Sequence, residues 1–389
     1  SLGDNTMYPL PPNAKYVTPH GTGDHSGTSW SNAYSIQDLK HRLASNTSFY
    51  FTDSTFLVDS IVVNNFTNIS FIGKGKDKTI LEGIDVGNVE SIINWSIKCF
   101  DIPNSSNTTI KDLQIRRFRR WGIRVGSTSN NFLGHNLYID SCGWTAVSGD
   151  PPVQEIASPC GVKLIGDDGI FRKSYIMQSG WDGMQVAGYR VLIDTTTIYA
   201  TGQDEPDALQ QGDGIGSLVN PDSFYYVHTN GDSVKVWKTA QFTVRKCNIN
   251  TVVDRKSGIE AGEKPPEKHS EKPLVQIYDS IISGGKGVGI TQDAHPRIGN
   301  FYSSIEKCTI QSLNPDRYTL RVESWDSGTS GWIRGNRFIS PADYNPLLLC
   351  PVGEYDTDSI AVNYPSNTNR WFKGLEEFDF CVTHNLITP

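Results

Sequence analysis

The sequence predicts an all-β fold, a parallel β-helix, and three observations lead to this prediction. The phrase acid-small-apolar-polar begins at Asp182, Asp207 and Asp232, and therefore recurs every 25 residues. A fixed period of this size is typical of solenoids, in which each coil stacks on the next. Apolar and polar residues alternate within the phrase, which predicts short strands. Gly, Asn, Asp and Ser are frequent between the strands, as expected at the corners of the coils.

A first series of strands extends outward from these phrases. The apolar third position of the phrase recurs at Ile123, Met184, Leu209, Val234, Ile259, Val288 and Leu320. The residues that follow these apolar positions are Arg124, Gln185, Gln210, Lys235, Glu260, Gly289 and Arg321. Successive side chains of a strand point to opposite faces, so we expect the first set to face the core and the second to face outward.

A second series of strands runs parallel to the first. Its six-residue phrases begin at Ile110, Val244, Ile277, Ile305 and Ile333. Each phrase begins and ends with an apolar residue, and most of the residues between the two are polar. Each coil should therefore contain at least two short strands joined by turns.

The ends of the solenoid need cover, because an open end exposes apolar side chains and unpaired strand edges. Ile36, Leu39 and Leu43 have the i, i+3, i+7 spacing of a short amphipathic helix, which we expect to cap the first coil. We predict a segment with this cap at 1–59, the β-helix at 60–340 and a C-terminal cap or tail at 341–389. No apolar stretch has the length of a membrane span.

The seven cysteines do not form a dense disulfide framework for a chain of 389 residues. Cys247 and Cys308 occupy the same position of the second-series phrase, which predicts buried thiols that stack in the core. Two disulfides remain open alternatives, Cys142 with Cys160 and Cys350 with Cys381.

The opening phrase Gly27-Thr-Ser-Trp-Ser-Asn-Ala resembles the start of many secreted right-handed β-helix proteins of the pectate-lyase-like superfamily. The coil phrase Asp-x-apolar-Gln is similar to the same superfamily. It includes polysaccharide lyases, polysaccharide hydrolases, epimerases and phage tailspikes. The resemblance therefore implies a right-handed, secreted β-helix that acts on or binds glycans, and leaves the reaction open.

The stacked aspartates are the first candidate site. Equivalent residues of adjacent coils lie about 4.8 Å apart, so Asp182, Asp207 and Asp232 would form a column of carboxylates. Such charges repel unless a cation, a shared proton or a nearby base compensates them. Calcium fits best, because it accepts several oxygen ligands in flexible geometry. The alternative is structural, since Asp is favoured at turns, where it bonds backbone amides.

A lyase must neutralise the carboxylate of a uronate and remove its C5 proton with a base. Lys235 is the preferred base, provided that its pKa is lowered, and Arg321, Lys238 and His228 are substitutes. Calcium-dependent pectate lyases collect acidic residues on one face beside a Lys or Arg base. Asp182, Asp207 and Asp232, with Lys235 and Arg321, resemble that arrangement loosely. A hydrolase would instead use two carboxyls. The pairs considered are Asp207 with Asp232 and Asp232 with Glu260. Asp182-Gly and Asp207-Ala fit the aspartate positions of polygalacturonases, but the Gly-His-Gly and Arg-Ile-Lys elements of that family are absent.

An arginine cluster suggests an anionic substrate. The chain has a net charge of −7. It nevertheless concentrates arginines around Phe118 and Trp121, at Arg116, Arg117, Arg119, Arg120 and Arg124. These could clamp carboxylates while aromatic rings stack on sugars, with Gln185, Gln210 and Trp237 as further binding residues. The alternative is that the arginines pair with acids of adjacent coils. The negative charge argues against nucleic acid.

These observations predict a secreted enzyme that cleaves an acidic polysaccharide, by β-elimination rather than hydrolysis. The alternatives are an inverting glycoside hydrolase and a non-catalytic, tailspike-like adhesion protein. We expect a monomer or a trimer, with no membrane or nucleic-acid partner.

Overall fold

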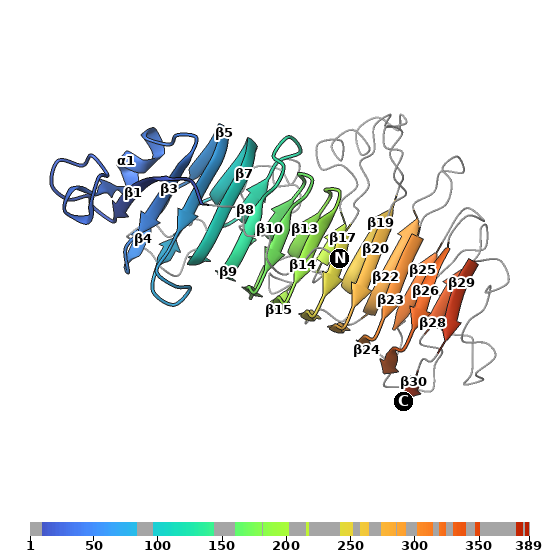
Figure 1. The fold of residues 1–389 in the computed structure, drawn as a ribbon. Coiled ribbons are helices and arrows are strands. Elements are labelled where there is room, and N and C mark those ends of the chain that lie inside the picture. Colours follow the sequence, from blue (N-terminus) through green and yellow to red (C-terminus); the bar gives the residue numbers. More distant parts are fainter. Residues whose placement is uncertain are drawn as a thin grey trace, which may run out of the picture.

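The computed structural model describes residues 10–83, 96–143, 160–180, 182–201, 215–217, 242–251, 257–263, 274–284, 286–292, 302–313, 319–323, 330–339, 347–350, 379–383 and 386–388. Its strands stack in bands along one axis, and all strand pairs between coils are parallel (Figure 1). The predicted right-handed parallel β-helix is confirmed.

The N-terminal coils contain the described helices and the longest strands. These elements are β1 (Asn13–Thr18), the 3-10 helix η1 (Trp30–Asn32), β2 (Tyr34–Ser35), α1 (Ile36–His41), β3 (Thr47–Phe51), β4 (Thr55–Leu57), β5 (Ile61–Ile72), β6 (Ile80–Glu82) and β7 (Lys98–Arg116). The predicted helix is present as α1, which begins with a capping box between Ser35 and Asp38. Ile36 and Leu39 are buried in the core. No described helix is long and apolar enough to span a bilayer.

From Trp121 onward most coils have three strands, which form three rows along the molecule. The first row is β8 (Trp121–Val125), β10 (Cys160–Leu164), β13 (Asp182–Val186), β16 (Ile215–Ser217), β19 (Ser257–Glu263), β22 (Lys286–Gln292), β25 (Leu320–Glu323) and β28 (Leu347–Cys350). The second row is β9 (Leu133–Asp140), β11 (Ile170–Arg172), β14 (Val191–Asp194), β17 (Phe242–Arg245), β20 (Leu274–Tyr278), β23 (Tyr302–Glu306), β26 (Ser330–Arg334) and β29 (Asp379–Thr383). The third row continues from the end of β9 through β12 (Tyr175–Met177), β15 (Thr197–Thr201), β18 (Asn248–Thr251), β21 (Ile281–Gly284), β24 (Thr309–Ser312), β27 (Arg337–Ile339) and β30 (Leu386–Thr388).

The register of the first row corrects the 25-residue period. The inward apolar positions follow one another as Ile123, Val162, Met184, Ile215, Ile259, Val288 and Leu320. The prediction that Leu209 and Val234 occupy inward positions of successive coils in this row is therefore wrong. In the structure β13 pairs with β16, and β16 pairs directly with β19. The step at Val162 was missed. Segments of unequal length join the strands, so the spacing in sequence does not give the register.

Four of the five second-series phrases span a corner between two strands, whereas the phrase that begins at Ile110 lies within β7. Lys246, Asp279 and Lys307 stand between the second and third rows with positive φ angles of 52°, 47° and 54°. The backbone N–H of one corner residue donates to the carbonyl before the corner of the next coil, as from Lys246 to Tyr278. The phrases are therefore correctly aligned between coils, but each contains a left-handed corner residue that turns the chain.

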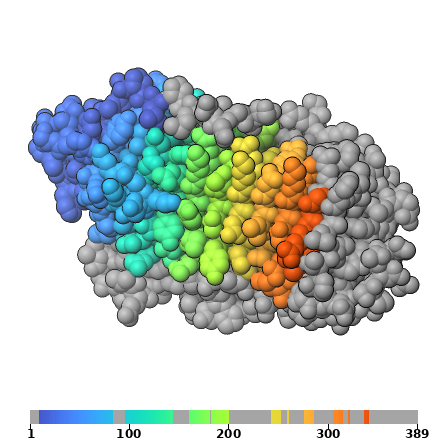
Figure 2. All heavy atoms as spheres, turned by 60° about the horizontal axis from the view of Figure 1, so that its bottom comes forward, coloured from blue at the N-terminus to red at the C-terminus, as the bar shows by residue number. Residues whose placement is uncertain are grey.

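One continuous core runs through the described coils. It extends from Val17 to Phe338 and includes a stack of Phe49, Phe71 and Phe100, with ring centroids 5.7 and 4.9 Å apart. The space-filling view shows successive coils as bands in sequence order (Figure 2). Parallel pairing also extends beyond the range 60–340, since β1 pairs with β3 before it and β28 pairs with β25 after it.

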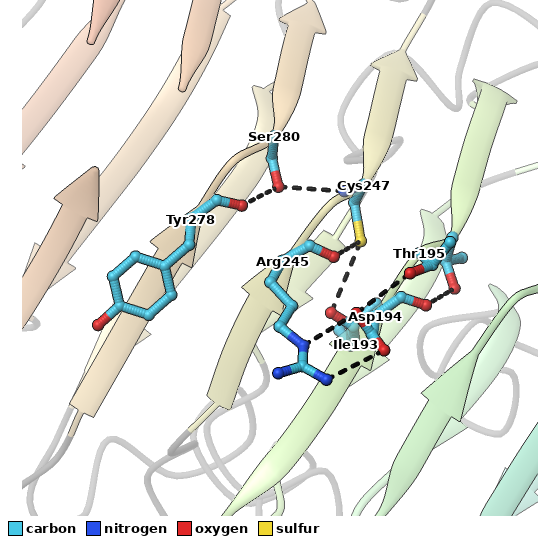
Figure 3. A network of polar contacts seen from close by, with 8 residues as sticks. Ile193, Asp194, Thr195, Arg245, Cys247, Tyr278 and Ser280 are labelled. Atoms are coloured by element: carbon cyan, nitrogen blue, oxygen red, sulfur yellow. Dashed lines mark hydrogen bonds and ion pairs between the residues drawn. The ribbon is translucent and has the colours of Figure 1, made fainter. Parts of the chain in front are cut away.

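Buried thiols line the inner side of the corner between the second and third rows. Cys247 and Cys308 lie at equivalent places two coils apart, with Ser280 between them. The backbone N–H of Cys247 donates to Ser280 Oγ at 3.2 Å, and this hydroxyl donates to the carbonyl of Tyr278 (Figure 3). The predicted equivalence and burial of the two thiols are confirmed, whereas Ser280 separates them, so they do not stack on each other. Cys142 and Cys160 are free, so that disulfide is not formed, and Cys350 and Cys381 lie in strands whose side chains are outside the description.

We expect Cys247→Ser to reduce the loss of stability at alkaline pH. Burial raises the pKa of the Cys247 thiol from 9.0 to about 12. The folded protein thus keeps a proton that the unfolded chain releases. This stabilisation is complete below pH 9 and is lost between pH 9 and about 12. The loss should be about 1.4 kcal/mol smaller per pH unit in the variant.

Urea unfolding at pH 8, 9.5 and 10.5 measures this difference. Serine fits the position, because Ser280 already occupies the equivalent one in the next coil. Cys308→Ser, with a thiol whose pKa burial also raises to about 12, should behave alike. Identical pH slopes for the variants and the wild type would contradict the prediction.

Candidate functional site

A repeated phrase in the first row places polar residues on the outer face. β8, β10 and β13 each read x-Gly-apolar-polar-apolar, with their glycines at positions 122, 161 and 183. A Cβ on Gly161 would lie 2.7 Å from the carbonyl oxygen of Gly183 and 2.8 Å from Cγ2 of Ile176. Gly161 therefore faces inward, and so does Val162 after it. Because two consecutive residues face inward, the residue before the glycine is turned outward.

This turn brings the first and fourth residues of each phrase to one face. Gln185 Nε2 donates to Asp182 Oδ2 at 2.6 Å. The Trp121 ring centroid lies 5.5 Å from Arg124 Cζ. Strict alternation from Met184 would point Asp182 inward, and the glycine between them removes this conflict. Asp182 therefore shares the outer face with the polar row.

A continuous polar row runs along the outer face of these strands. In strand register it contains Asp101, Arg124, Lys163, Gln185, Gly216, Glu260, Gly289 and Arg321. We call this set the first-row polar site, together with Trp121 and Asp182. Glu260 and Arg321 are placed by their strands alone, because their side chains lie outside the description.

The N-terminal end of the site is an ion-pair cluster around Asp101. Arg124 Nη1 donates to Asp101 Oδ1 at 2.9 Å, and Lys98 pairs with Asp101 Oδ2. The Asp101 carboxylate is thus shared by two cations. Arg124 keeps 22% of its side-chain surface exposed, so its guanidinium remains accessible to a ligand.

Three cationic groups surround the Trp121 ring. Lys163 Nζ lies 5.4 Å from the ring centroid, and the guanidinium carbons of Arg124 and Arg120 lie 5.5 and 5.6 Å from it. The ring face attracts cations electrostatically, so Trp121 holds positive charge together. Lys163 is only 2% exposed, although its strand position faces outward.

Asp182 and Gln185 form the other end of the site and are almost fully buried, at 3% and 1% exposure. The amide of Gln185 donates to the carboxylate of Asp182. Its Oε1 is a buried acceptor for which the described part of the chain supplies no hydrogen-bond donor. Buried acceptors normally have a partner, so a ligand hydroxyl or a water molecule would satisfy this one.

The neighbouring thiol is not a nucleophile. Burial raises the pKa of Cys160, which pairs in register with Asp182 and is fully buried. The nearby Lys163 lowers this pKa and the Asp182 carboxylate raises it, but burial dominates. The thiol is therefore protonated at neutral pH, which removes the thiolate that covalent catalysis would need.

The predicted arginine cluster divides into two groups. Arg116 and Arg117 both form ion pairs with Glu82. Phe118, which follows them in the sequence, is buried in the core. These pairs match the structural alternative, in which arginines bond acids of adjacent coils. Arg120, Trp121 and Arg124 come together instead at the first-row polar site. Arg119 donates its backbone N–H to the carbonyl of Ser96.

Several predicted site residues lie outside the described residues. They are Asp207, Gln210, His228, Asp232, Lys235, Trp237 and Lys238. Their roles stay predictions. The calcium site rests on two of them, and the described residues contain no group of three His, Cys, Asp or Glu side chains able to hold a metal. The described part of the chain therefore supplies only Asp182 toward a calcium site.

The sequence interpretation missed Asp101 and Lys163. A signal for Lys163 was present, because Trp121-Gly-Ile-Arg-Val, Cys160-Gly-Val-Lys-Leu and Asp182-Gly-Met-Gln-Val share one pattern. The regular aspartate spacing concealed it. Asp101 is not part of a repeated sequence phrase, and only its strand pairing with Arg124 places it in the row.

These features define the chain as a right-handed parallel β-helix protein with a polar row on one outer face. The predicted β-helix fold is thus shown by the strand pairings themselves. No protein-family model and no curated protein sequence matches the chain.

Solved structures of several β-helix proteins are similar at low sequence identity. Pectate lyase Pel9A has a TM-score of 0.47 and 11% identity, with 97% of this chain and 77% of that chain covered. The A-module of the mannuronan C-5 epimerase AlgE4 from Azotobacter vinelandii has a TM-score of 0.42 and 9% identity, covering 96% and 98%. PfbA, a surface adhesin of Streptococcus pneumoniae, has a TM-score of 0.37 and 12% identity, covering 90% and 86%.

Proposed function

We propose that the protein is a secreted polysaccharide lyase that cleaves an acidic glycan at the first-row polar site. The observation that carries this proposal is the group of cations around Trp121, next to the buried pair of Asp182 and Gln185. An aromatic ring flanked by cations suits a sugar that carries a carboxylate.

The reaction assigns separate tasks to the side chains of the site. Arg124 and Arg120 would pair with the uronate carboxylate, which makes its C5 proton more acidic. Lys163 Nζ, as the neutral amine, would take this proton. The C–H electron pair would form the C4–C5 double bond as the C4–O bond breaks, and the leaving oxygen would take a proton from water. A base of this kind must be held away from water, and the 2% exposure of Lys163 fits that need. Gln185 Oε1 would accept a hydrogen bond from a sugar hydroxyl.

Hydrolysis has less support from the described residues. An inverting hydrolase places its two carboxyls about 6.5–9.5 Å apart. Asp101 and Asp182 are separated by three coil steps, or about 14 Å along the axis. Asp101 is also shared between Arg124 and Lys98. A hydrolytic pair would need Glu260 or the predicted residues Asp207 and Asp232.

The test is incubation with polygalacturonate, alginate and a neutral β-glucan, each with and without a calcium chelator. A lyase produces unsaturated uronates, which absorb in the ultraviolet, from the acidic glycans alone. Reducing ends without new absorbance would replace the proposal by hydrolysis. Binding without either signal would replace it by the adhesion function. Loss of activity with chelator would support a role for calcium, toward which the described residues supply Asp182.

A further inference from the structure

A second cationic feature follows the corner between the second and third rows. The corner residues in coil order are Lys173, Thr195, Lys246, Asp279, Lys307 and Gly335. Lysine therefore occupies every second coil over five coils. With one coil step of about 4.8 Å, the lysine positions repeat at about 9.6 Å along the axis. We call this row the lysine edge.

The corner itself does not require lysine. Lys173, Lys246 and Lys307 have φ angles of 51°, 52° and 54°, a region that Gly, Asn and Asp occupy more readily. Asp279 and Gly335 already serve at this corner in the same row. Three lysines in an unfavourable backbone conformation therefore suggest that their charge, rather than the turn, accounts for their presence.

A surface hollow opens at the lysine edge, with a cavity volume of about 460 Å³. Lys76, Lys173 and Lys246 line it together with Tyr175, Thr195 and Asn248. Lys76 Nζ lies 3.9 Å from the centroid of the Tyr175 ring, so a cation–π contact holds this ammonium in place. Asp279 is the one carboxylate and Lys76, Lys173 and Lys246 are the three ammonium-bearing residues among those that line the hollow.

The adjacent acid of the second row does not offset these lysines. Arg245 donates from Nε and Nη2 to the two carboxylate oxygens of Asp194, at 2.9 and 3.2 Å (Figure 3). This bidentate pair neutralises Asp194 beside Thr195. Net positive charge therefore remains at the hollow, where Thr195 Oγ1 and Thr196 Oγ1 already donate to Asp194 and the Asn248 side chain also lines the surface.

We propose that the lysine edge binds an anionic polysaccharide chain lying along the solenoid axis, with its carboxylates paired to lysines of alternate coils. The hollow around Lys76, Lys173 and Lys246 is the main subsite. This site is formed at the corner that joins the second and third rows, separate from the first-row polar site. It shares with the proposed function only the assumption of an acidic glycan, and it would retain a polymer without taking part in its cleavage.

Binding of a polygalacturonate decamer tests the proposal by calorimetry, in a Lys163→Met background so that the ligand is not cleaved. Lys173→Asn combined with Lys246→Asn should weaken binding about tenfold, the sum expected for two exposed ion pairs. Asparagine suits the left-handed corner, so the thermal midpoint should not fall. Equal affinity of this variant and its parent would overturn the proposal.

A matched control separates the site from general charge effects. Arg190→Asn also removes one positive charge from a left-handed corner residue, with φ of 54°, but at a different corner. It should leave the affinity unchanged, whereas Lys246→Asn alone should weaken it. Equal weakening by both would reduce the lysine edge to unspecific attraction and overturn the proposal.

The two proposals fail in different ways. With wild-type Lys163, the lysine-edge variants should keep the turnover of a trimer and lose turnover only on long polymer. A protein without lyase activity whose decamer binding still depends on Lys173 and Lys246 would refute the proposed reaction and support the lysine edge. Lyase activity together with decamer binding that does not depend on Lys173 and Lys246 would support the proposed reaction and refute the lysine edge.

Discussion

Lys163→Met is expected to lower the rate of glycan cleavage by a factor of about 10² to 10⁴, the contribution typical of a general base. Methionine retains most of the side-chain volume next to Trp121 and removes the amine. The initial rate of absorbance by unsaturated product measures the effect. The thermal midpoint should stay the same or rise, because a buried amine is replaced by an apolar side chain.

Lys111→Met is the matched control for this prediction. Lys111 lies in β7, pairs with His135 of the second row and contacts Asp112 at 3.7 Å, away from the first-row polar site. Its rate should equal that of the wild type. Arg124→Met should raise KM more than it lowers kcat, since this residue would bind the carboxylate. A Lys163→Met protein with an unchanged rate would exclude Lys163 as the base.

Phe71→Ala is expected to lower the free energy of unfolding by about 3–5 kcal/mol, the range for removing a large buried aromatic side chain. Phe71 is fully buried and stacks between Phe49 and Phe100 of adjacent coils. Because each coil contacts mainly its neighbours, the loss should concentrate in the N-terminal coils. Urea unfolding gives the total change, and hydrogen exchange shows which strands are affected.

Phe66→Ala provides the comparison within the same strand. Phe66 is partly buried and packs against the edge of the core, so its loss should cost about 1 kcal/mol. Equal effects of the two substitutions would show that the aromatic stack does not dominate the stability of these coils.

The fold could be predicted because inward positions leave a strong apolar pattern. Ile259, Val288 and Leu320 align in the structure as in the sequence interpretation. The six-residue phrases also align, because their corner needs a fixed number of residues. The first-row step between Met184 and Ile259 could not be predicted in the same way. The segments joining those strands vary in length, and a chance spacing of three aspartates suggested the wrong coils.

The predicted site residues Trp121, Arg124, Asp182 and Gln185 lie in one row of strands, and their roles stay predictions. The pairing of Arg116 and Arg117 with Glu82 was not visible, since 34 and 35 residues separate these arginines from the carboxylate. Lys163 was missed because its phrase lacks an acid. Sequence patterns report which face a residue takes, whereas ion pairs depend on the coils that become neighbours.

The identical registers of β8 with β10 and of β10 with β13 make the intervening coil a removable module. Trp121 pairs with Cys160 and Cys160 with Asp182, so excising Cys160–Trp181 would set Trp121 opposite Asp182 without a shift of register. The molecule would shorten by one repeat of about 4.8 Å. Arg124 would then stand next to Gln185, with Lys163 deleted. The composition of the polar row can thus change by gain or loss of whole coils as well as by point substitution.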